Sequence, residues 1–231
     1  TSTAVNITVA AASSGFTAYN DCSSSATTPA NTTQYRGNGT ASGYLKDFAT
    51  GTVQPVTLTI TANQVTYDGT GGPMPNSGTD AYNVFNGKVV FDDAIWYTTI
   101  TSGWWMDATF TGLDPQKQYE FVTSVNRGGS GSDYGQRWSK FTISGADACV
   151  QAGTPGVTVL SNESVSFISG SNLVNSYVAR WTNIRCGADG TFKVRVNEGG
   201  VANKGYAFYG IMLRETSAQA LAPTVSITSP A

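Results

Sequence analysis

The chain has 231 residues, of which 40% are hydrophobic and 11% aromatic, enough to fill the core of one large domain. Only 12% are charged, about half of the usual share of roughly 25%, which suits a secreted β-protein with a Ser-, Thr-, Asn- and Gly-covered surface. The net charge of −2, without a basic run, argues against nucleic acid as a partner, and no apolar run reaches the ~18 residues of a membrane helix. Histidine is absent, which excludes Ser-His-Asp and Cys-His triads and His-ligated zinc. Paired carboxylates, calcium chemistry and pure binding remain.

Alternation of apolar and polar residues predicts strands in the first part of the chain. Val5, Ile7 and Val9 indicate an opening strand, and a long polar loop follows over 21–43. The sequence VTLTIT at 56–61 alternates cleanly and predicts another strand. Residues 81–85 and 88–91 flank Asn86-Gly87, a dipeptide typical of tight turns, and a short helix over 81–86 is the alternative.

The stretch 104–143 is the centre of the predicted fold. Trp104, Met106 and Phe110 alternate with a second set that begins at Trp105, as in a half-buried strand. Further strands are predicted at 119–125 and 137–143, and a glycine-rich loop joins these two. We predict that the three strands form an antiparallel meander.

Short strands continue after this stretch, beyond a loop predicted at 145–156. They are expected at 158–160, 165–168, 177–184, 191–197 and 206–214. In the strand 191–197, Phe192, Val194 and Val196 face inward, whereas Lys193 and Arg195 face outward. About ten short strands with Gly-rich loops predict an all-β fold, an antiparallel β-sandwich of jelly-roll type, over residues 1–216.

Three cysteines are present, and their spacing fits no metal motif. We predict one disulfide, Cys149–Cys186, because both residues flank strands in loop-like surroundings. Cys22 is then left over. The alternative is three unrelated buried thiols.

Exposed aromatic side chains are the leading candidates for a functional site. Trp104 and Trp105 are neighbours on a strand and must face opposite ways, so one of them lies outside the core. Trp138 is expected on the face opposite to Phe141 and Ile143. A flat aromatic ring can stack on a sugar ring, while planar polar groups bind its hydroxyls. The residues that we predict to bind a ligand are Trp105, Asp107, Asn126, Arg127, Tyr134, Arg137 and Trp138. The alternatives are tryptophans packed in the core and a mobile loop at 126–138.

Carboxylates offer weaker signals. A glycosidase needs two of them roughly 5–10 Å apart, and the sequence pairs none of the four glutamates with another acid. Calcium is a further expectation, because sandwich domains bind it through carboxylates and backbone carbonyls. Its candidate ligands are Asp21, Asp47, Asp68, Asp80 and Glu215.

Three segments carry a resemblance to a known kind of domain: GTDAYNVFNGKV (78–89), FTGLDPQKQYEF (110–121) and GYAFYGIMLRE (205–215). Together they resemble a domain that recurs in large secreted bacterial proteins beside fibronectin-type and immunoglobulin-like modules. They are also similar in style to the jelly-roll carbohydrate-binding modules of polysaccharide-degrading enzymes. The resemblance implies secretion, association with polysaccharide and a structural calcium ion.

The last fifteen residues, 217–231, differ in character from the rest. Residues 217–221 are linker-like, and PTVSITSPA (223–231) resembles the first strand of an immunoglobulin-like module. We therefore expect the chain to be part of a multi-modular protein, with neighbouring modules of the same chain as partners.

The function predicted from the sequence is a non-catalytic carbohydrate-binding module that anchors a larger secreted enzyme or adhesin to a polysaccharide. Two alternatives stay open. One is a structural or adhesive spacer with every tryptophan in the core. The other is a lyase or glycoside hydrolase that works without histidine.

Overall fold

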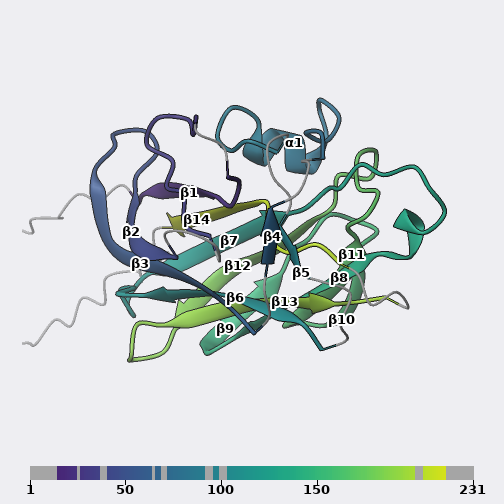
Figure 1. Ribbon diagram of the computed structural model, residues 1–231. Coiled ribbons are helices and arrows are strands. Elements are labelled where there is room, and N and C mark those ends of the chain that lie inside the picture. The colour runs from purple at the N-terminus through teal and green to yellow at the C-terminus, as the bar shows by residue number, and fades with distance from the viewer. Residues whose placement is uncertain are drawn as a thin grey trace, which may run out of the picture.

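A computed structural model describes residues 15–24, 27–36, 41–63, 66–68, 72–91, 96–98, 103–200 and 205–216. Two antiparallel sheets pack face to face, which confirms the all-β sandwich (Figure 1). The five-stranded sheet has the order β1 (Thr17–Asp21), β14 (Gly210–Thr216), β7 (Gln118–Ser124), β12 (Val178–Cys186) and β9 (Ala146–Gln151). The seven-stranded sheet has the order β10 (Thr158–Ser161), β11 (Ser164–Ile168), β8 (Trp138–Ser144), β13 (Phe192–Glu198), β6 (Trp105–Thr111), β3 (Val53–Ala62) and β2 (Ser42–Lys46). A separate pair joins β4 (Thr66–Asp68) to β5 (Trp96–Thr98).

The order of the strands corrects the predicted meander. The strands β6, β7 and β8 form where they were expected, but β7 lies in the other sheet and β13 lies between β6 and β8. From β6 to β14 the chain crosses repeatedly between the two sheets, as it does in a jelly roll. Alternation determines which residues of a strand face inward, but it does not determine which strand lies beside it.

The core lies between the two sheets. Phe110 on β6 packs edge-on against Phe121 on β7, with ring centroids 5.9 Å apart, and Phe121 contacts Trp181 on β12 at 6.2 Å. All three rings are fully buried. Burial of one such side chain contributes about 1.5–3 kcal/mol, so the inward-facing sets hold the sheets together.

Several predicted boundaries differ from the structure. The segments 21–43 and 145–156, expected as loops, contain part of β1 and β2 and all of β9. Residues 205–208 are buried but do not form part of a strand, so the last strand begins at Gly210. The short helix is present as α1 (Asp80–Phe85). The strand predicted at Val5–Val9 and the tail 217–231 lie outside the described residues.

The outer face of the five-stranded sheet is covered by α1 and the loops beside it (Figure 1). Phe85 on α1 is fully buried and meets the ring of Tyr19 on β1 at 6.4 Å. Gly210 on β14 makes this approach possible, because a Cβ there would lie only 3.0 Å from the Phe85 ring and 2.9 Å from Val89. The helix therefore covers the outer face of the five-stranded sheet.

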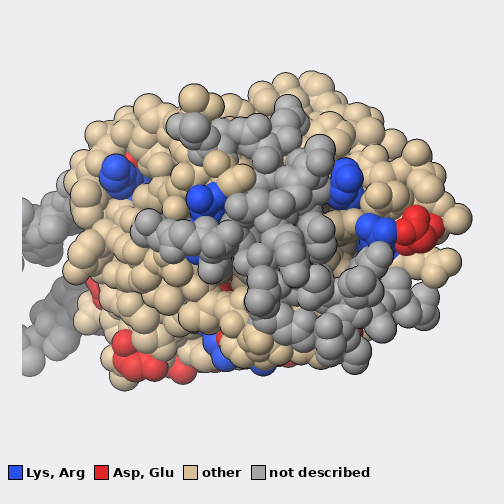
Figure 2. All heavy atoms as spheres, viewed as in Figure 1, with Lys and Arg blue, Asp and Glu red and all other residues tan. Residues whose placement is uncertain are grey.

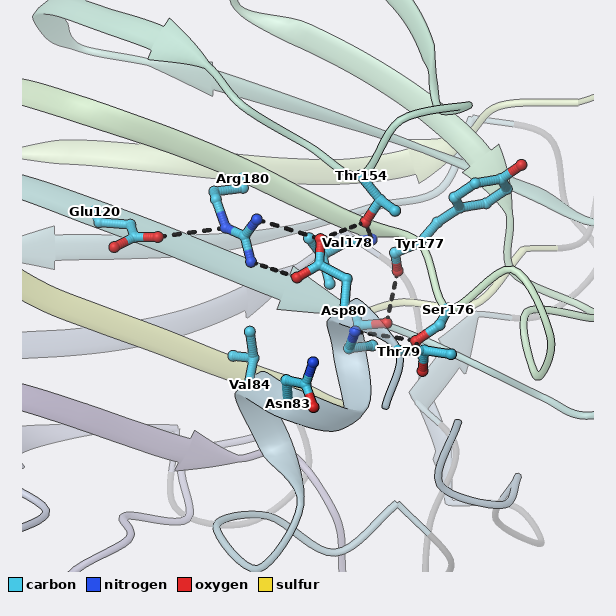
Figure 3. Close-up of polar contacts among 12 residues, drawn as sticks. Thr79, Asp80, Asn83, Val84, Glu120, Thr154, Ser176, Tyr177, Val178 and Arg180 are labelled. Atoms are coloured by element: carbon cyan, nitrogen blue, oxygen red, sulfur yellow. Dashed lines mark hydrogen bonds and ion pairs between the residues drawn. The ribbon is translucent and has the colours of Figure 1, made fainter. Parts of the chain in front are cut away.

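Paired charges fix α1 to that sheet (Figure 3). The guanidinium of Arg180 on β12 binds both carboxylate oxygens of Asp80, at 2.7 and 3.2 Å. Its Nε lies 3.3 Å from a carboxylate oxygen of Glu120 on β7, and Glu120 also pairs with Arg214 on β14. Thr154 donates a hydrogen bond of 2.8 Å to Asp80. Every charge of this network has an opposite partner.

The predicted disulfide is wrong: Cys149 and Cys186 are free thiols in this structure. Cys186 pairs with Ala146, which is three residues from Cys149 on β9. Three residues of a strand span about 10 Å, whereas the Cα atoms of a disulfide lie within roughly 7 Å of each other. Cys22 is buried as a third free thiol, and burial raises its pKa strongly.

Candidate functional site

The outer face of the seven-stranded sheet carries an ordered array of polar side chains on β8, β13 and β6. The strand register aligns them in three rows across the three strands. These nine residues, which we call the sheet-face site, are Lys140, Asn197 and Trp105 in the first row, Thr142, Arg195 and Asp107 in the second, and Ser144, Lys193 and Thr109 in the third. Inward neighbours such as Phe141, Val196 and Met106 are buried, so strict alternation directs the nine to the other face.

Trp105 and Trp104 face opposite ways, as their position on one strand requires. Trp104 is fully buried, whereas Trp105 is half-buried on the sheet-face site. The loop before β6 holds Trp105 in place, because its backbone N–H donates to Asn63 Oδ1 at 2.8 Å and Asn63 Nδ2 donates to the Gly103 carbonyl at 2.9 Å. The orientation expected for Trp105 is therefore confirmed.

Asp107 lies beneath two cations at the centre of the site. Its oxygens accept hydrogen bonds from Arg195 Nε at 2.6 Å and Nη2 at 2.8 Å, and from Lys193 Nζ at 3.3 Å. Burial by itself would raise the pKa of Asp107, but the hydrogen bonds and charges of Arg195 and Lys193 outweigh it and lower the pKa. Asp107 is only 5% exposed, so it orients Arg195 and has little surface left for the ligand contact that we predicted.

Arg195 joins the charged and aromatic parts of the site. Its guanidinium carbon lies 4.1 Å from the centre of the Trp105 ring, in the range of a cation–π interaction. Nε and one Nη are bound to Asp107, which leaves the second Nη for a ligand. The side chain is 37% exposed despite these contacts.

A shallow, open depression covers most of the sheet-face site. Its volume is about 410 Å³, and it is lined by Gly103, Trp104, Trp105, Lys140, Thr142, Ser144, Lys193, Arg195 and Asn197. A second hollow of about 160 Å³ shares Ser144 and Lys193 with it and continues toward Gly145 and Thr191. The two follow β13 along most of its length, about 20 Å at 3.4 Å per residue.

Trp138 lies on the same face but outside the depression. The burial pattern of β8 confirms that it faces away from Phe141 and Ile143. Its indole N–H donates to the Gly135 carbonyl at 3.1 Å, so the ring is tied to the 126–138 loop. From the register and sheet spacings, the Cα atoms of Trp138 and Trp105 are about 12 Å apart.

The predicted loop residues form a second, separate cluster. The Tyr134 ring packs on Gly129 and has the guanidinium of Arg137 above it at 4.1 Å and that of Arg127 at 5.7 Å. Arg137 also contacts the carboxylate of Asp133 and the hydroxyl of Tyr206. Tyr134 and Arg137 are thus held by contacts within the loop, and a role of Arg127, Tyr134 and Arg137 in binding a ligand stays a prediction.

Asn126, also predicted to bind a ligand, is completely buried. Its Nδ2 donates to the Pro73 carbonyl at 2.8 Å, and its Oδ1 accepts from the N–H groups of Gly128 and Asn172 at 3.0 and 2.8 Å. Burial thus corrects this assignment, because Asn126 organises the base of the loop and has no surface for a ligand.

Of the five acidic residues considered for calcium, the side chain of Asp68 lies outside the described part of the structure, and the other four are dispersed. Asp80 pairs with Arg180, Glu215 pairs with Lys117, and Asp47 accepts hydrogen bonds from its own turn. Asp21 accepts from the N–H groups of Ser23 and Val90. Within the described ranges, no three His, Cys, Asp or Glu side chains converge on a point where a metal ion could sit. Calcium stays a prediction.

Some members of the sheet-face site were not predicted from the sequence. Lys193 and Arg195 were expected to point outward but were not connected with Trp105, because the position of β13 between β6 and β8 was not foreseen, and Lys140 was not among the predicted site residues. Figure 2 shows only a few charged side chains among the described residues of the face in view, as expected from the composition. Three cations in adjacent rows are therefore a local concentration.

Comparisons with protein-family models, with curated proteins and with solved structures find no match to this chain. In the described residues, no helix has the length and apolar character needed to span a bilayer. The described residues form an antiparallel β-sandwich with one face covered by a helix and an aromatic and basic depression on the other.

Proposed function

We propose that this domain is a non-catalytic carbohydrate-binding module that holds a larger secreted protein on a polysaccharide. The observation that carries the proposal is the half-exposed Trp105 in an open depression lined by lysine, arginine, asparagine, serine and threonine side chains. An indole offers a flat apolar surface to the C–H face of a sugar ring, and the surrounding groups match its hydroxyls in both donor and acceptor character.

The shape of the site supports a polymer as the ligand. Small-molecule sites are usually concave pockets that bury most of their ligand. Here the depression is shallow, and the adjoining hollow extends it along β13. An extended chain can lie in such a groove and leave at both ends. The low charge and the resemblance to modules of secreted bacterial proteins support an extracellular role.

The non-catalytic character is supported by the state of Asp107, the carboxylate at the centre of the site. A general acid in a glycosidase has a raised pKa, whereas the pKa of Asp107 is lowered by Arg195 and Lys193 despite its burial. Arg195 and Lys193 keep the Asp107 carboxylate ionised and donate hydrogen bonds to both of its oxygens. Such a carboxylate suits a structural role better than proton donation.

Affinity gel electrophoresis on a panel of plant, algal and microbial polysaccharides tests the proposal. At least one polymer should retard the protein, and Trp105→Ala should weaken that retardation about tenfold or more, because the stacking surface is lost. Tyr82→Ala, which removes an aromatic ring from α1, is the matched control and should leave it unchanged.

The alternatives have distinct outcomes in the same assay. Retardation by no polymer would overturn the proposal and favour a spacer domain. Release of reducing ends or unsaturated products from a bound polymer would show an enzyme instead.

A further inference from the structure

We infer that the ligand of the sheet-face site is an acidic polysaccharide, whose carboxylate or sulfate groups are bound by Lys140, Lys193 and Arg195 beside Trp105. This inference rests on the proposed function and narrows it to one class of polymer. The net charge of the chain, −2, does not indicate an acidic ligand, because the cations are concentrated locally.

The three cations occupy three successive rows of the site. Arg195 and Lys193 lie two residues apart on β13, and Lys140 lies diagonally across from Arg195 on β8. Neighbours of both kinds have Cα atoms about 7–8 Å apart. The three long side chains can therefore contact anionic groups on one stretch of polymer.

The charges at this site do not cancel. Asp107 is the one carboxylate among the nine residues, and it binds the guanidinium of Arg195 and the ammonium group of Lys193. Three cations and one anion leave an excess of two positive charges. No described acidic side chain forms an ion pair with Lys140.

The other carboxylates near the groove point inward or line a different hollow. Glu198 follows Asn197, but alternation turns its side chain inward, one oxygen accepts the Gly103 N–H at 3.0 Å, and the other is buried. Asp147 and Glu163 line a separate hollow of about 240 Å³ on the far side of Ser144. Among the nine residues of the sheet-face site, Asp107 is therefore the one carboxylate beside the three cations.

The aromatic ring and the positive charge are presented together. Arg195 is oriented by a two-point contact with Asp107 and lies over the Trp105 ring, so little side-chain freedom remains to be lost on binding. A uronic acid or sulfated sugar carries its anionic group at the edge of a ring. Contact of such a ring with the exposed part of Trp105, beside Arg195, would place that group within reach of Arg195 and Lys140.

Two pairs of polymers test the inference by affinity electrophoresis of the intact chain. One pair is polygalacturonate and its carboxyl-reduced form, and the other is a sulfated galactan and its desulfated form. The acidic member of at least one pair should bind about tenfold or more tightly than its neutral counterpart. The pair that shows the preference distinguishes carboxylate from sulfate.

The variant Lys140→Gln/Lys193→Gln should reduce the preference about tenfold, because it keeps Trp105 and the Arg195–Asp107 contact but removes two charges. Lys46→Gln/Lys88→Gln makes the same change in net charge away from the site and should keep the preference. Calorimetry should show that the affinity of the unmodified protein for the acidic polymer falls as NaCl is raised from 50 to 300 mM.

Two results would overturn the inference. Equal binding of acidic and neutral polymers that still depends on Trp105 would remove the acidic specificity and leave the proposed function in place. Binding of neither member of either pair, together with no retardation on the wider panel, would remove both.

Discussion

The two outer faces of the sandwich differ in how they use the same side-chain chemistry. On the five-stranded sheet, α1 covers the strands, Phe85 is buried beneath it, and Arg180 lies between Asp80 and Glu120. On the seven-stranded sheet, Trp105 and the cations beside it are half-exposed, and the positive charges outnumber the negative ones. Covered groups with matched charges stabilise a fold, whereas exposed groups with unmatched charges are available to a ligand. Substitutions on the two faces should therefore affect different properties.

The largest effect is expected from the covered face. Phe85→Ala should lower the free energy of unfolding by about 3–4 kcal/mol, because it opens a cavity between α1 and β14. Urea denaturation followed by tryptophan fluorescence measures the loss. The folded protein should bind polysaccharide as the unmodified protein does.

Phe85→Leu is the control for this experiment, since it keeps most of the side-chain volume and should cost less than about 1.5 kcal/mol. A Phe85→Ala protein that stays folded but loses polysaccharide binding would contradict the separation of stability and binding between the two faces. The two faces would then be coupled through the core.

The sequence predicted the central strands and the edge strand β10, but it missed the other three edge strands of the two large sheets. Strands β3, β6, β7, β8 and β13 lie within two or three residues of their expected positions, because each buries one face and alternates accordingly. The missed strands, β1, β2 and β9, all lie at the edge of a sheet. On β9 no residue is fully buried, and β1 buries the polar side chains of Asn20 and Asp21. Such strands are specified by their neighbours and show no clear alternation.

The candidate site was partly predictable for the same reason. The face on which Trp105 and Trp138 lie follows from alternation, and so does the outward direction of Lys193 and Arg195. That these residues meet depends on β13 lying between β6 and β8, a long-range pairing with no local signal. Composition drew attention to Arg127, Tyr134 and Arg137, but density of polar groups does not reveal that they bind each other.

A smaller effect is expected at Asp107 on the open face. The pKa of this carboxyl is lowered in the folded state, so its contribution to stability is complete above the unfolded pKa of about 3.9 and is lost as the pH falls through the lower folded value. Asp107→Asn should cost about 1 kcal/mol at pH 7, a modest value because Arg195 and Lys193 are partly exposed.

Urea denaturation of both proteins between pH 7 and pH 2.5 measures this contribution. The difference between them should shrink as the pH falls below about 4, where Asp107 takes up a proton in the unfolded state, and should be lost once the pH passes below the lowered pKa of the folded state. A difference that stays constant over the whole range would mean that the shape of the Asp107 side chain, and not its charge, stabilises the sheet.

The smallest expected effect is spectroscopic. Trp104 and Trp181 are fully buried, whereas Trp105 and Trp138 are half-buried on the open face. Acrylamide should therefore quench part of the tryptophan emission, and Trp105→Phe should lower the quenchable part, while Trp181→Phe should not. A bound acidic polysaccharide should protect the unmodified protein from quenching and leave Trp105→Phe unprotected. Protection that persists in Trp105→Phe would place the ligand away from the sheet-face site, and the contrast between the two faces would then say nothing about binding.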